Sequence, residues 1–160
     1  MLRRLRASEK QMLVVQSNLS TSYANLGRID DALRMDRAIY ASFLRLYGES
    51  HGETLNAALN LSITLYSANS ATESKTLTRR LLPLARRALG ADNDTCLRLA
   101  HAYVIAVMKC AASSRDEFVF AERLLDDTAR RFRRVLGIAH PGTARAERDL
   151  ALIRERLAEL

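Results

Sequence analysis

Three histidines and two cysteines are the side chains of this 160-residue sequence best suited to catalysis or metal binding. His51, His101 and His140 stand in separate segments, and none has the spacing to Cys96 or Cys110 that metal ligands require. A nucleophile also needs a base and an orienting group within hydrogen-bond reach, and no segment supplies all three. The sequence therefore predicts no catalytic residue, no metal site and no cofactor, and hence a protein that is not an enzyme.

Two of these histidines lie in segments that echo each other. Residues 46–54 read LYGESHGET, and residues 135–143 read VLGIAHPGT. Between them, residues 88–95 read ALGADNDT. In all three, a basic and apolar run closes with Gly, and a short polar turn follows that ends in Thr. Because His51 and His140 occupy matching positions in these turns, we expect both to have structural roles.

The echo belongs to an internal repeat. Gly48 and Gly90 are 42 residues apart, and a shift by this amount also places Asn18-Leu19-Ser20 on Asn60-Leu61-Ser62. The next glycine, Gly137, follows 47 residues after Gly90, and the extra length fits best in residues 109–118. Repetition with a period of this size indicates a repeat architecture in which neighbouring units stack.

Each repeat divides into two helical patterns. Apolar residues recur at helical spacing in the first segment, residues 13–26, and Gly27 then ends the helix. In the next repeat Asn69 takes the place of Gly27, and asparagine also tolerates a left-handed backbone. Pro83 falls within the second helix of that repeat, where we expect a kink. No segment keeps a period of two, so strands are not expected.

The motif Asn18-Leu19-x-x-x-Tyr23-x-x-x-Gly27-x-Ile29-x-x-Ala32 resembles the tetratricopeptide repeat. The 42-residue period, the closing Leu-Gly or Tyr-Gly and the HP-x-T turn of residues 140–143 resemble the kinesin-light-chain type of that repeat. The resemblance covers essentially the whole chain. It implies an all-α, right-handed α-solenoid of antiparallel helix pairs, with about three and a half pairs and a C-terminal capping helix. It also implies a member, or a fragment, of a longer repeat array.

We therefore predict one tetratricopeptide-like domain over residues 1–160. Its parts would be residues 1–12 as the tail of a preceding helix, 13–48, 49–90 and 91–137 as three repeats, and 138–160 as the capping helix.

Proteins of this family bind peptides or partner proteins in a concave groove lined by the first helix of each pair, so the resemblance implies an interaction scaffold with a protein or peptide partner. By position, the groove would offer Ser17, Asn18, Thr21 and Asn25, then Asn56, Asn60, Ile63 and Ser67, then Arg98, His101, Val104 and Met108. Asn18 and Asn60 could hold a peptide backbone through their amides, which both donate and accept. Alternatively, they could tie neighbouring helices together. His101 is expected to be a groove or packing residue rather than a base.

A second function, from another class, rests on the net charge of +7. Nucleic acid or an anionic surface could bind a basic stripe on the convex face, formed by two arginine clusters at corresponding places in successive repeats. These are Arg79, Arg80, Arg86 and Arg87, and Arg130, Arg131, Arg133 and Arg134. However, the arginines alternate with Asp and Glu, which favours solvated helix faces. We therefore do not expect nucleic acid as the partner.

Several features bear on the compartment and on self-association. No apolar run reaches about 18 residues, so no transmembrane segment is expected. Two cysteines without a pairing pattern favour a reducing compartment. The start, MLRRLRASEK, has the basic residues of a mitochondrial presequence, but Glu9 interrupts it, and we expect a cytoplasmic protein. If the array is incomplete, its end helices would expose apolar patches, so we also expect weak self-association.

Overall fold

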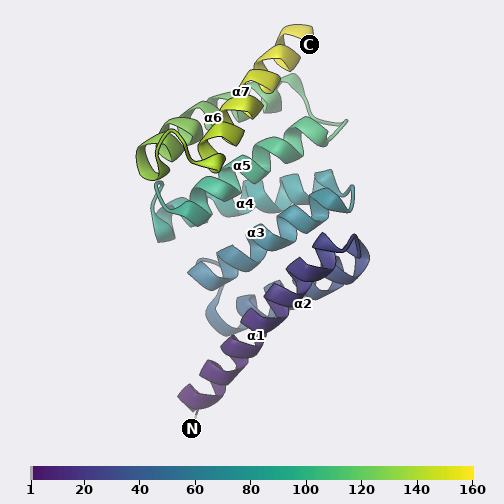
Figure 1. Ribbon diagram of the computed structural model, residues 1–160, viewed down its shortest axis with the longest axis vertical. Helices are drawn as coiled ribbons and strands as arrows, with labels where there is room; N and C mark the ends of the chain where they lie inside the picture. Colours follow the sequence, from purple (N-terminus) through teal and green to yellow (C-terminus); the bar gives the residue numbers. More distant parts are fainter. Residues whose placement is uncertain (1) are drawn as a thin grey trace.

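Seven α-helices follow one another along residues 2–160 (Figure 1). The computed structural model describes the backbone of residues 2–160 and the side chains of residues 8–160. The helices are α1 (Leu2–Asn25), α2 (Ile29–Tyr47), α3 (Gly52–Ser67), α4 (Ala71–Leu89), α5 (Asp94–Lys109), α6 (Arg115–Leu136) and α7 (Pro141–Glu159). The described backbone contains no strand, as predicted. None of its helices combines the length and the hydrophobicity needed to cross a membrane.

The helices form two layers. We call α1, α3, α5 and α7 the leading helices and α2, α4 and α6 the trailing helices. Figure 1 shows the leading helices stacked in one layer and the trailing helices behind them. Each helix packs mainly against the helices that precede and follow it in the sequence. The fold is therefore an α-solenoid of antiparallel helix pairs, with α7 as the half pair at the C-terminal end, as the resemblance implied.

Glycines end the trailing helices for a conformational reason. At Gly48 and Gly90 the backbone has φ of +83° and +88°, a region that strains any side chain. The N–H of each glycine donates to the carbonyl four residues earlier, which completes the last helical turn. Within the pairs, Asn69 has φ of +59° where Gly27 has +77°, so the predicted left-handed asparagine is confirmed.

A side chain caps each of α3, α5 and α7, the leading helices that follow a turn. Nδ1 of His51 and Nδ1 of His140 each accept a hydrogen bond from the backbone N–H two residues later, at 3.3 and 3.0 Å. Asn93 does the same through its side-chain oxygen at 2.9 Å. These bonds satisfy backbone donors that a helix start leaves unpaired. The structural role predicted for His51 and His140 is therefore confirmed.

The extra residues of the third repeat lie where the sequence placed them. Residues 110–114 connect α5 to α6, whereas only residues 68–70 connect α3 to α4. In addition, α6 has 22 residues and α4 has 19. A capping box starts the longer helix, because Ser114 and Glu117 each bond the other's backbone N–H.

The start of the chain differs from the prediction. Residues 1–12 are predicted above to be the tail of a separate helix, but residues 2–25 form one continuous helix, and Met1 lies outside the described residues. The position that corresponds to the turn glycine Gly48 is Arg6, and no Gly or Pro follows it before Leu13. Because nothing in this segment stops a helix, the first leading helix extends through it.

The apolar core is largest in the C-terminal part of the solenoid. One cluster of buried side chains joins α3, α4, α5, α6 and α7. A smaller cluster joins α1, α2 and α3 through Leu13, Ile39, Phe43 and Ala57. Among the described side chains of α1, only Leu13 and Ser20 are buried. The first helix is therefore held by fewer buried apolar contacts than the other leading helices.

Candidate binding groove

The exposed side of the leading helices is hollowed. A hollow of about 780 Å³ crosses α3, α5 and α7. It is lined by Ser62, Ile63, Tyr66 and Ser67, by Ala102, Ile105, Met108 and Lys109, and by Arg145, Arg148, Asp149 and Leu152. Aliphatic side chains are exposed within it, with Ile63 at 45% and Leu152 at 50%. The hollow thus combines apolar surface with basic groups.

Two smaller hollows continue along the same layer. One of about 300 Å³ lies between α1 and α3 and is lined by Val14, Ser17, Asn18, Phe43, Glu53, Asn56, Ala57 and Asn60. Another of about 200 Å³ lies beside α5 and the start of α7, and its lining includes Arg98, His101 and His140. We call the three hollows together the groove face.

Most of the predicted groove residues of α1 and α3 line these hollows. Ser17, Asn18, Asn56 and Asn60 line the α1–α3 hollow, and Ile63 and Ser67 line the large one. The other two predicted residues of α1, Thr21 and Asn25, are exposed outside the hollows described. No bound peptide tests whether any of these side chains contacts a ligand, so their roles stay predictions.

On α5 one predicted residue does not reach the groove face. Arg98 and His101 line the small hollow and Met108 lines the large one, but Val104 is fully buried in the core. A helix turns about 100° per residue, so the choice of position decides which face a side chain occupies. Val104 lies on the face of α5 that packs inside the solenoid, and Ile105 lines the hollow instead.

The 42-residue period could have located the missed positions. The predicted groove positions on α3 are Asn56, Asn60, Ile63 and Ser67. A shift of these positions by 42 residues gives Arg98, Ala102, Ile105 and Lys109 on α5, and all four line a hollow. The later spacing of 47 residues then gives Arg145, Asp149 and Leu152 on α7, which also line the large hollow. The sequence prediction included no residue of α7.

Asparagines on the groove face connect neighbouring leading helices. The amide nitrogen of Asn60 on α3 donates to the hydroxyl of Ser17 on α1 at 3.1 Å. The hydroxyl of Thr95 on α5 donates to the amide oxygen of Asn56 on α3 at 2.9 Å. For Asn60 the interhelical role, which was one of the two alternatives, is therefore present. The Asn18 side chain makes no such bond within residues 8–160 and remains exposed in its hollow.

His101 is a packing residue that joins α5 to α7. It is only 8% exposed, and its Nε2 lies 2.6 Å from a carboxylate oxygen of Asp149. The residues around the adjoining hollow include no Ser, Thr or Cys, so this His–Asp pair has no nucleophile beside it there. Throughout the described residues, no group of three or more His, Cys, Asp or Glu is arranged to hold a metal. Nothing in this arrangement points to catalysis.

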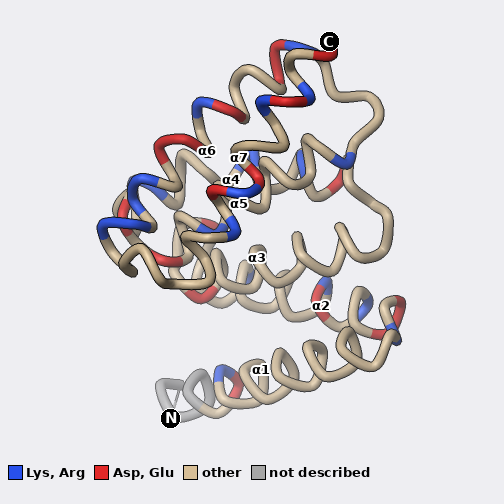
Figure 2. Tube along the Cα trace, turned by 45° about the horizontal axis from the view of Figure 1, so that its top comes forward, with Lys and Arg blue, Asp and Glu red and all other residues tan. Residues whose placement is uncertain are grey.

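The groove face becomes basic toward the C-terminal end. In Figure 2 most of α1 and α3 carries no charge. In the large hollow, Lys109 lies 4.2 Å from the centre of the Tyr66 ring and donates to the Tyr66 carbonyl at 3.0 Å. Arg145 and Arg148 of α7 also line this hollow, and within residues 8–160 neither forms an ion pair. Unpaired positive charge therefore lies next to exposed aliphatic surface.

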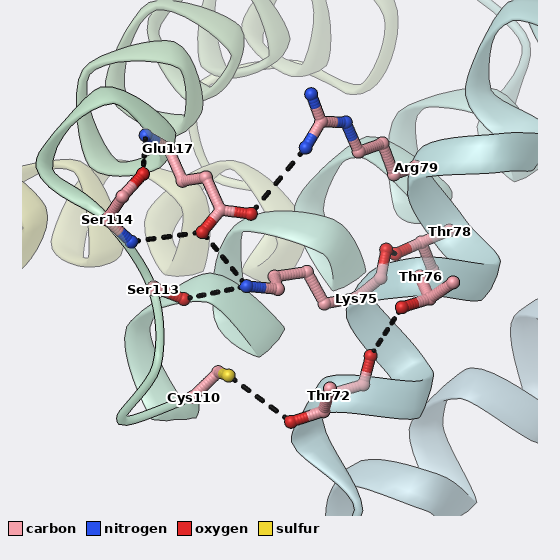
Figure 3. A network of polar contacts seen from close by, with 9 residues as sticks. All are labelled: Thr72, Lys75, Thr76, Thr78, Arg79, Cys110, Ser113, Ser114 and Glu117. Atoms are coloured by element: carbon pink, nitrogen blue, oxygen red, sulfur yellow. Dashed lines mark hydrogen bonds and ion pairs between the residues drawn. The ribbon is translucent and has the colours of Figure 1, made fainter.

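The arginine clusters of the trailing helices are in a different situation, because intramolecular contacts occupy them. Figure 3 shows Arg79 of α4 reaching Glu117 of α6, at 3.6 Å. The other contacts are Arg80 with Glu49, Arg86 with Asp127, Arg87 with the Pro83 carbonyl, Arg130 with Asp126, Arg131 with Asp92 and Asp127, Arg133 with Glu147, and Arg134 with Asp92. Carboxylates thus neutralise most of the convex stripe, which weakens the case for a nucleic-acid surface.

A family model and a structural comparison agree with this geometry. The model of the tetratricopeptide repeat matches residues 13–53 and residues 54–94. The comparison with curated proteins gives no significant match.

Two solved structures share the fold. One is a kinesin-light-chain-like protein of Podosopora anserina with nearly identical TPR-like repeats, at a TM-score of 0.78 and 17% identity, covering 89% of this chain. The present chain spans 65% of the length of that structure. The other is a single-substitution variant of the same protein, with a TM-score of 0.53, 17% identity, and coverage of 92% of this chain and 90% of that one. At this identity the likeness concerns the fold.

Proposed function

The chain belongs to the tetratricopeptide repeat family, and on this premise we propose that it is a non-enzymatic scaffold that binds a peptide or a partner protein in its concave groove. Repeats of this family generally mediate protein–protein interaction. We place the binding site on the groove face, with the large hollow across α3, α5 and α7 at its centre.

One observation carries this proposal: the large hollow combines exposed aliphatic side chains with two arginines that form no ion pair among residues 8–160. A contiguous exposed apolar surface with polar groups beside it typically marks a binding site. Ile63, Ile105 and Leu152 would contact an apolar side chain of the ligand. Arg145 and Arg148 would pair with a carboxylate close to it, because arginine binds carboxylates through two parallel hydrogen bonds. The preferred segment is therefore an extended peptide that carries an apolar residue next to an acidic one.

The alternative of nucleic-acid binding has less support. Phosphate binding requires arginines that are free to meet the nucleic-acid backbone, and the eight clustered arginines of α4 and α6 already contact carboxylates or a carbonyl. The cytoplasm remains our proposed compartment. Its support is that Cys96 and Cys110 are both free and buried, as expected of a protein kept in a reducing environment.

The proposal can be tested with peptides selected on the wild-type protein from a random display library and then titrated by fluorescence anisotropy. We expect Ile63→Glu and the double variant Arg145→Glu/Arg148→Glu to weaken binding at least about tenfold, the effect of losing about 1.4 kcal/mol. The loss caused by the arginine variant should shrink as salt rises.

Val135→Glu is the matched control. Val135 lies on α6 outside the hollows and is 46% exposed, against 45% for Ile63, so both variants introduce one charge at equal exposure. The control should bind as the wild type does. If instead binding survives in the groove variants and is lost in Arg130→Glu/Arg134→Glu, the groove proposal is wrong and the convex face is the working surface.

A further inference from the structure

The first helix exposes a row of apolar side chains that no other part of the described molecule covers. Met12, Val15, Leu19 and Leu26 are 60%, 62%, 43% and 75% exposed. Their spacings of three and four residues place Met12, Val15 and Leu19 along one face of α1, and Leu26, which directly follows the helix, lies seven residues further on in the same row. We call these four residues the α1 stripe.

The corresponding positions in the later repeats show the role of this stripe. With the shift of 42 residues, Met12, Val15 and Leu19 correspond to Thr54, Ala57 and Leu61 on α3, which are 0%, 5% and 4% exposed. A second shift gives Cys96, Leu99 and Tyr103 on α5, and the spacing of 47 gives Thr143, Ala146 and Leu150 on α7, none more than 8% exposed. The same positions are thus buried in every later leading helix and exposed in the first.

In α3, α5 and α7 the buried stripe faces the preceding trailing helix. The hydroxyl of Thr54 on α3 donates to the Phe43 carbonyl of α2 at 3.1 Å, and Ala57 packs in one cluster with Ile39 and Phe43. Cys110, which directly follows α5, continues the same face, and its sulfur lies 3.4 Å from the hydroxyl of Thr72 on α4. The α1 stripe is therefore a helix-packing surface of the established kind, without the helix that would complete it in the described chain.

The absence of charge on this part of α1 favours a second copy of the chain as the occupant. Between Gln11 and Asn25 the helix has no charged residue, so Figure 2 draws this length of α1 entirely in tan. Depletion of charge is typical of the buried centre of protein interfaces. In a two-fold contact each surface meets an identical one, so any charge at the centre would face a like charge. In a chain of net charge +7, an uncharged apolar stripe is a surface on which two copies can meet without repulsion.

The opposite end of the solenoid cannot take the stripe. On α7, Ala144, Ala151 and Arg154 occupy the positions that in α5 hold Leu97, Val104 and Val107. The α7 residues are exposed, whereas those of α5 are buried against the trailing helix. A head-to-tail contact would bury Arg154 against aliphatic side chains, at the cost of desolvating its charge. Contact between two α1 stripes has no such cost and closes after two copies.

We propose that the α1 stripe docks on the α1 stripe of a second copy, with the two helices antiparallel, and that the chain thereby forms a closed two-fold dimer. One helix from each copy makes a contact at or below the low end of the roughly 1,200–2,000 Å² buried in standard interfaces. The dimer therefore dissociates on dilution. This inference does not depend on the ligand of the groove face.

Sedimentation velocity of the whole chain, from micromolar to submillimolar concentration, tests the dimer. The weight-average mass should rise from one copy to two in the wild type and stay at one copy in Val15→Glu/Leu19→Glu. The control Val135→Glu/Ile138→Glu changes residues that are 46% and 70% exposed elsewhere, and it should dimerise as the wild type does. All four residues are exposed, so circular dichroism should show unchanged helix content. A wild type that stays monomeric throughout, or a stripe variant that still dimerises, overturns the proposal.

A cross-link tests the geometry. Leu19 lies at the middle of the stripe, so an antiparallel two-fold contact brings it close to Leu19 of the second copy. Under mild oxidation Leu19→Cys should form a disulfide-linked dimer, and Ala151→Cys on α7 should not. The native Cys96 and Cys110 are 2% and 6% exposed and do not compete. Cross-linking through position 151 with none through position 19 would place the contact at the wrong end and refute the model.

Discussion

Glu117 shows at the scale of one residue how successive repeats are joined. Its carboxylate accepts a hydrogen bond from the Ser114 backbone N–H and another from Nζ of Lys75 on α4, both at 3.0 Å, and Arg79 lies 3.6 Å away (Figure 3). Burial alone would raise the pKa of this carboxyl. Lys75, the Ser114 N–H and Arg79 together outweigh burial and hold the pKa below its ordinary value of 4.5. The charged form is therefore part of the folded structure.

This lowered pKa predicts a pH-dependent contribution to stability. The charged carboxylate stabilises the fold at pH values above 4.5, and the contribution is lost as the pH falls below 4.5 through the folded-state pKa. Glu117→Gln should lower the free energy of unfolding by about 1–3 kcal/mol at neutral pH, because Lys75 then lacks its charged partner. The difference from the wild type should shrink on acidification, which urea unfolding at a series of pH values would measure.

Three further variants check the cause. Lys75→Met should also lower the free energy of unfolding. The double variant Lys75→Met/Glu117→Gln should lower it by less than the sum of the two single variants, because both remove the same contact. Glu155→Gln, at an exposed position of α7, should change stability by no more than about 0.5 kcal/mol. A penalty for Glu117→Gln that stays constant at every pH would show that shape rather than charge matters at this position.

At the scale of elements, α4 contains a residue that opposes its own helix. Pro83 lies inside α4, and the helix continues through it from Ala71 to Leu89. A proline in this position lacks the backbone N–H that would bond the carbonyl of Arg79, and its ring crowds that carbonyl. The helix persists because Leu81, Leu82 and Ala85 are buried around the proline. Tertiary packing thus overrides a strong local preference.

Removal of this conflict should stabilise the protein. Pro83 is exposed, so Pro83→Ala leaves no cavity and restores one helical hydrogen bond. A helix-interior proline costs about 3 kcal/mol relative to alanine. The unfolded chain regains up to about 1 kcal/mol of conformational freedom, so the expected net gain is about 2 kcal/mol. Guanidinium unfolding would measure it, and a loss of stability would mean that packing around the ring, which the exposure of Pro83 does not suggest, dominates.

At the scale of the whole molecule, the two ends of the solenoid are unequal. The main cluster joins α3 to α7, and Leu150 and Ile153 bind the last helix into it. Arg154 adds contacts with Glu122 and Asp126. The first helix shares only the smaller cluster and leaves its stripe exposed. Stability should therefore rise from the N-terminal end toward the middle of the chain.

Hydrogen exchange followed by mass spectrometry would map this gradient. Segments with few buried apolar contacts open locally at low free-energy cost, so the amides of α1 should exchange fastest among the helices and those of α5 slowest. If the dimer forms, protection of α1 should increase with protein concentration while that of α7 stays constant. The variant Val15→Glu/Leu19→Glu should show no such concentration dependence. Fastest exchange in α7 would contradict the gradient.

The sequence by itself determined the repeat, its turns and its caps. Gly48, Gly90 and Gly137 end helices because of a backbone conformation that depends on one residue. The caps of His51 and His140 involve atoms two residues apart. Such local features recur wherever the sequence recurs, so the helix pairs and most groove positions on α1 and α3 could be read from the period. The continuity of α1 was also encoded, in the absence of any Gly or Pro near Arg6, but the alignment of repeats concealed it.

Only the tertiary structure decided which faces are covered and which charges are free. Helical spacing defines several rows of side chains on α5, and the packing of α4 and α6 selects the row that is buried, so Val104 lies in the core and Ile105 in the groove. Long arginine side chains find partners about forty residues away, as Arg131 does with Asp92. Five of the eight arginines in the convex clusters have such distant partners, whereas Arg145 and Arg148 are left unpaired in the groove within the described residues. The pairing of charges across repeats depends on the neighbours that folding brings together, which no local pattern specifies.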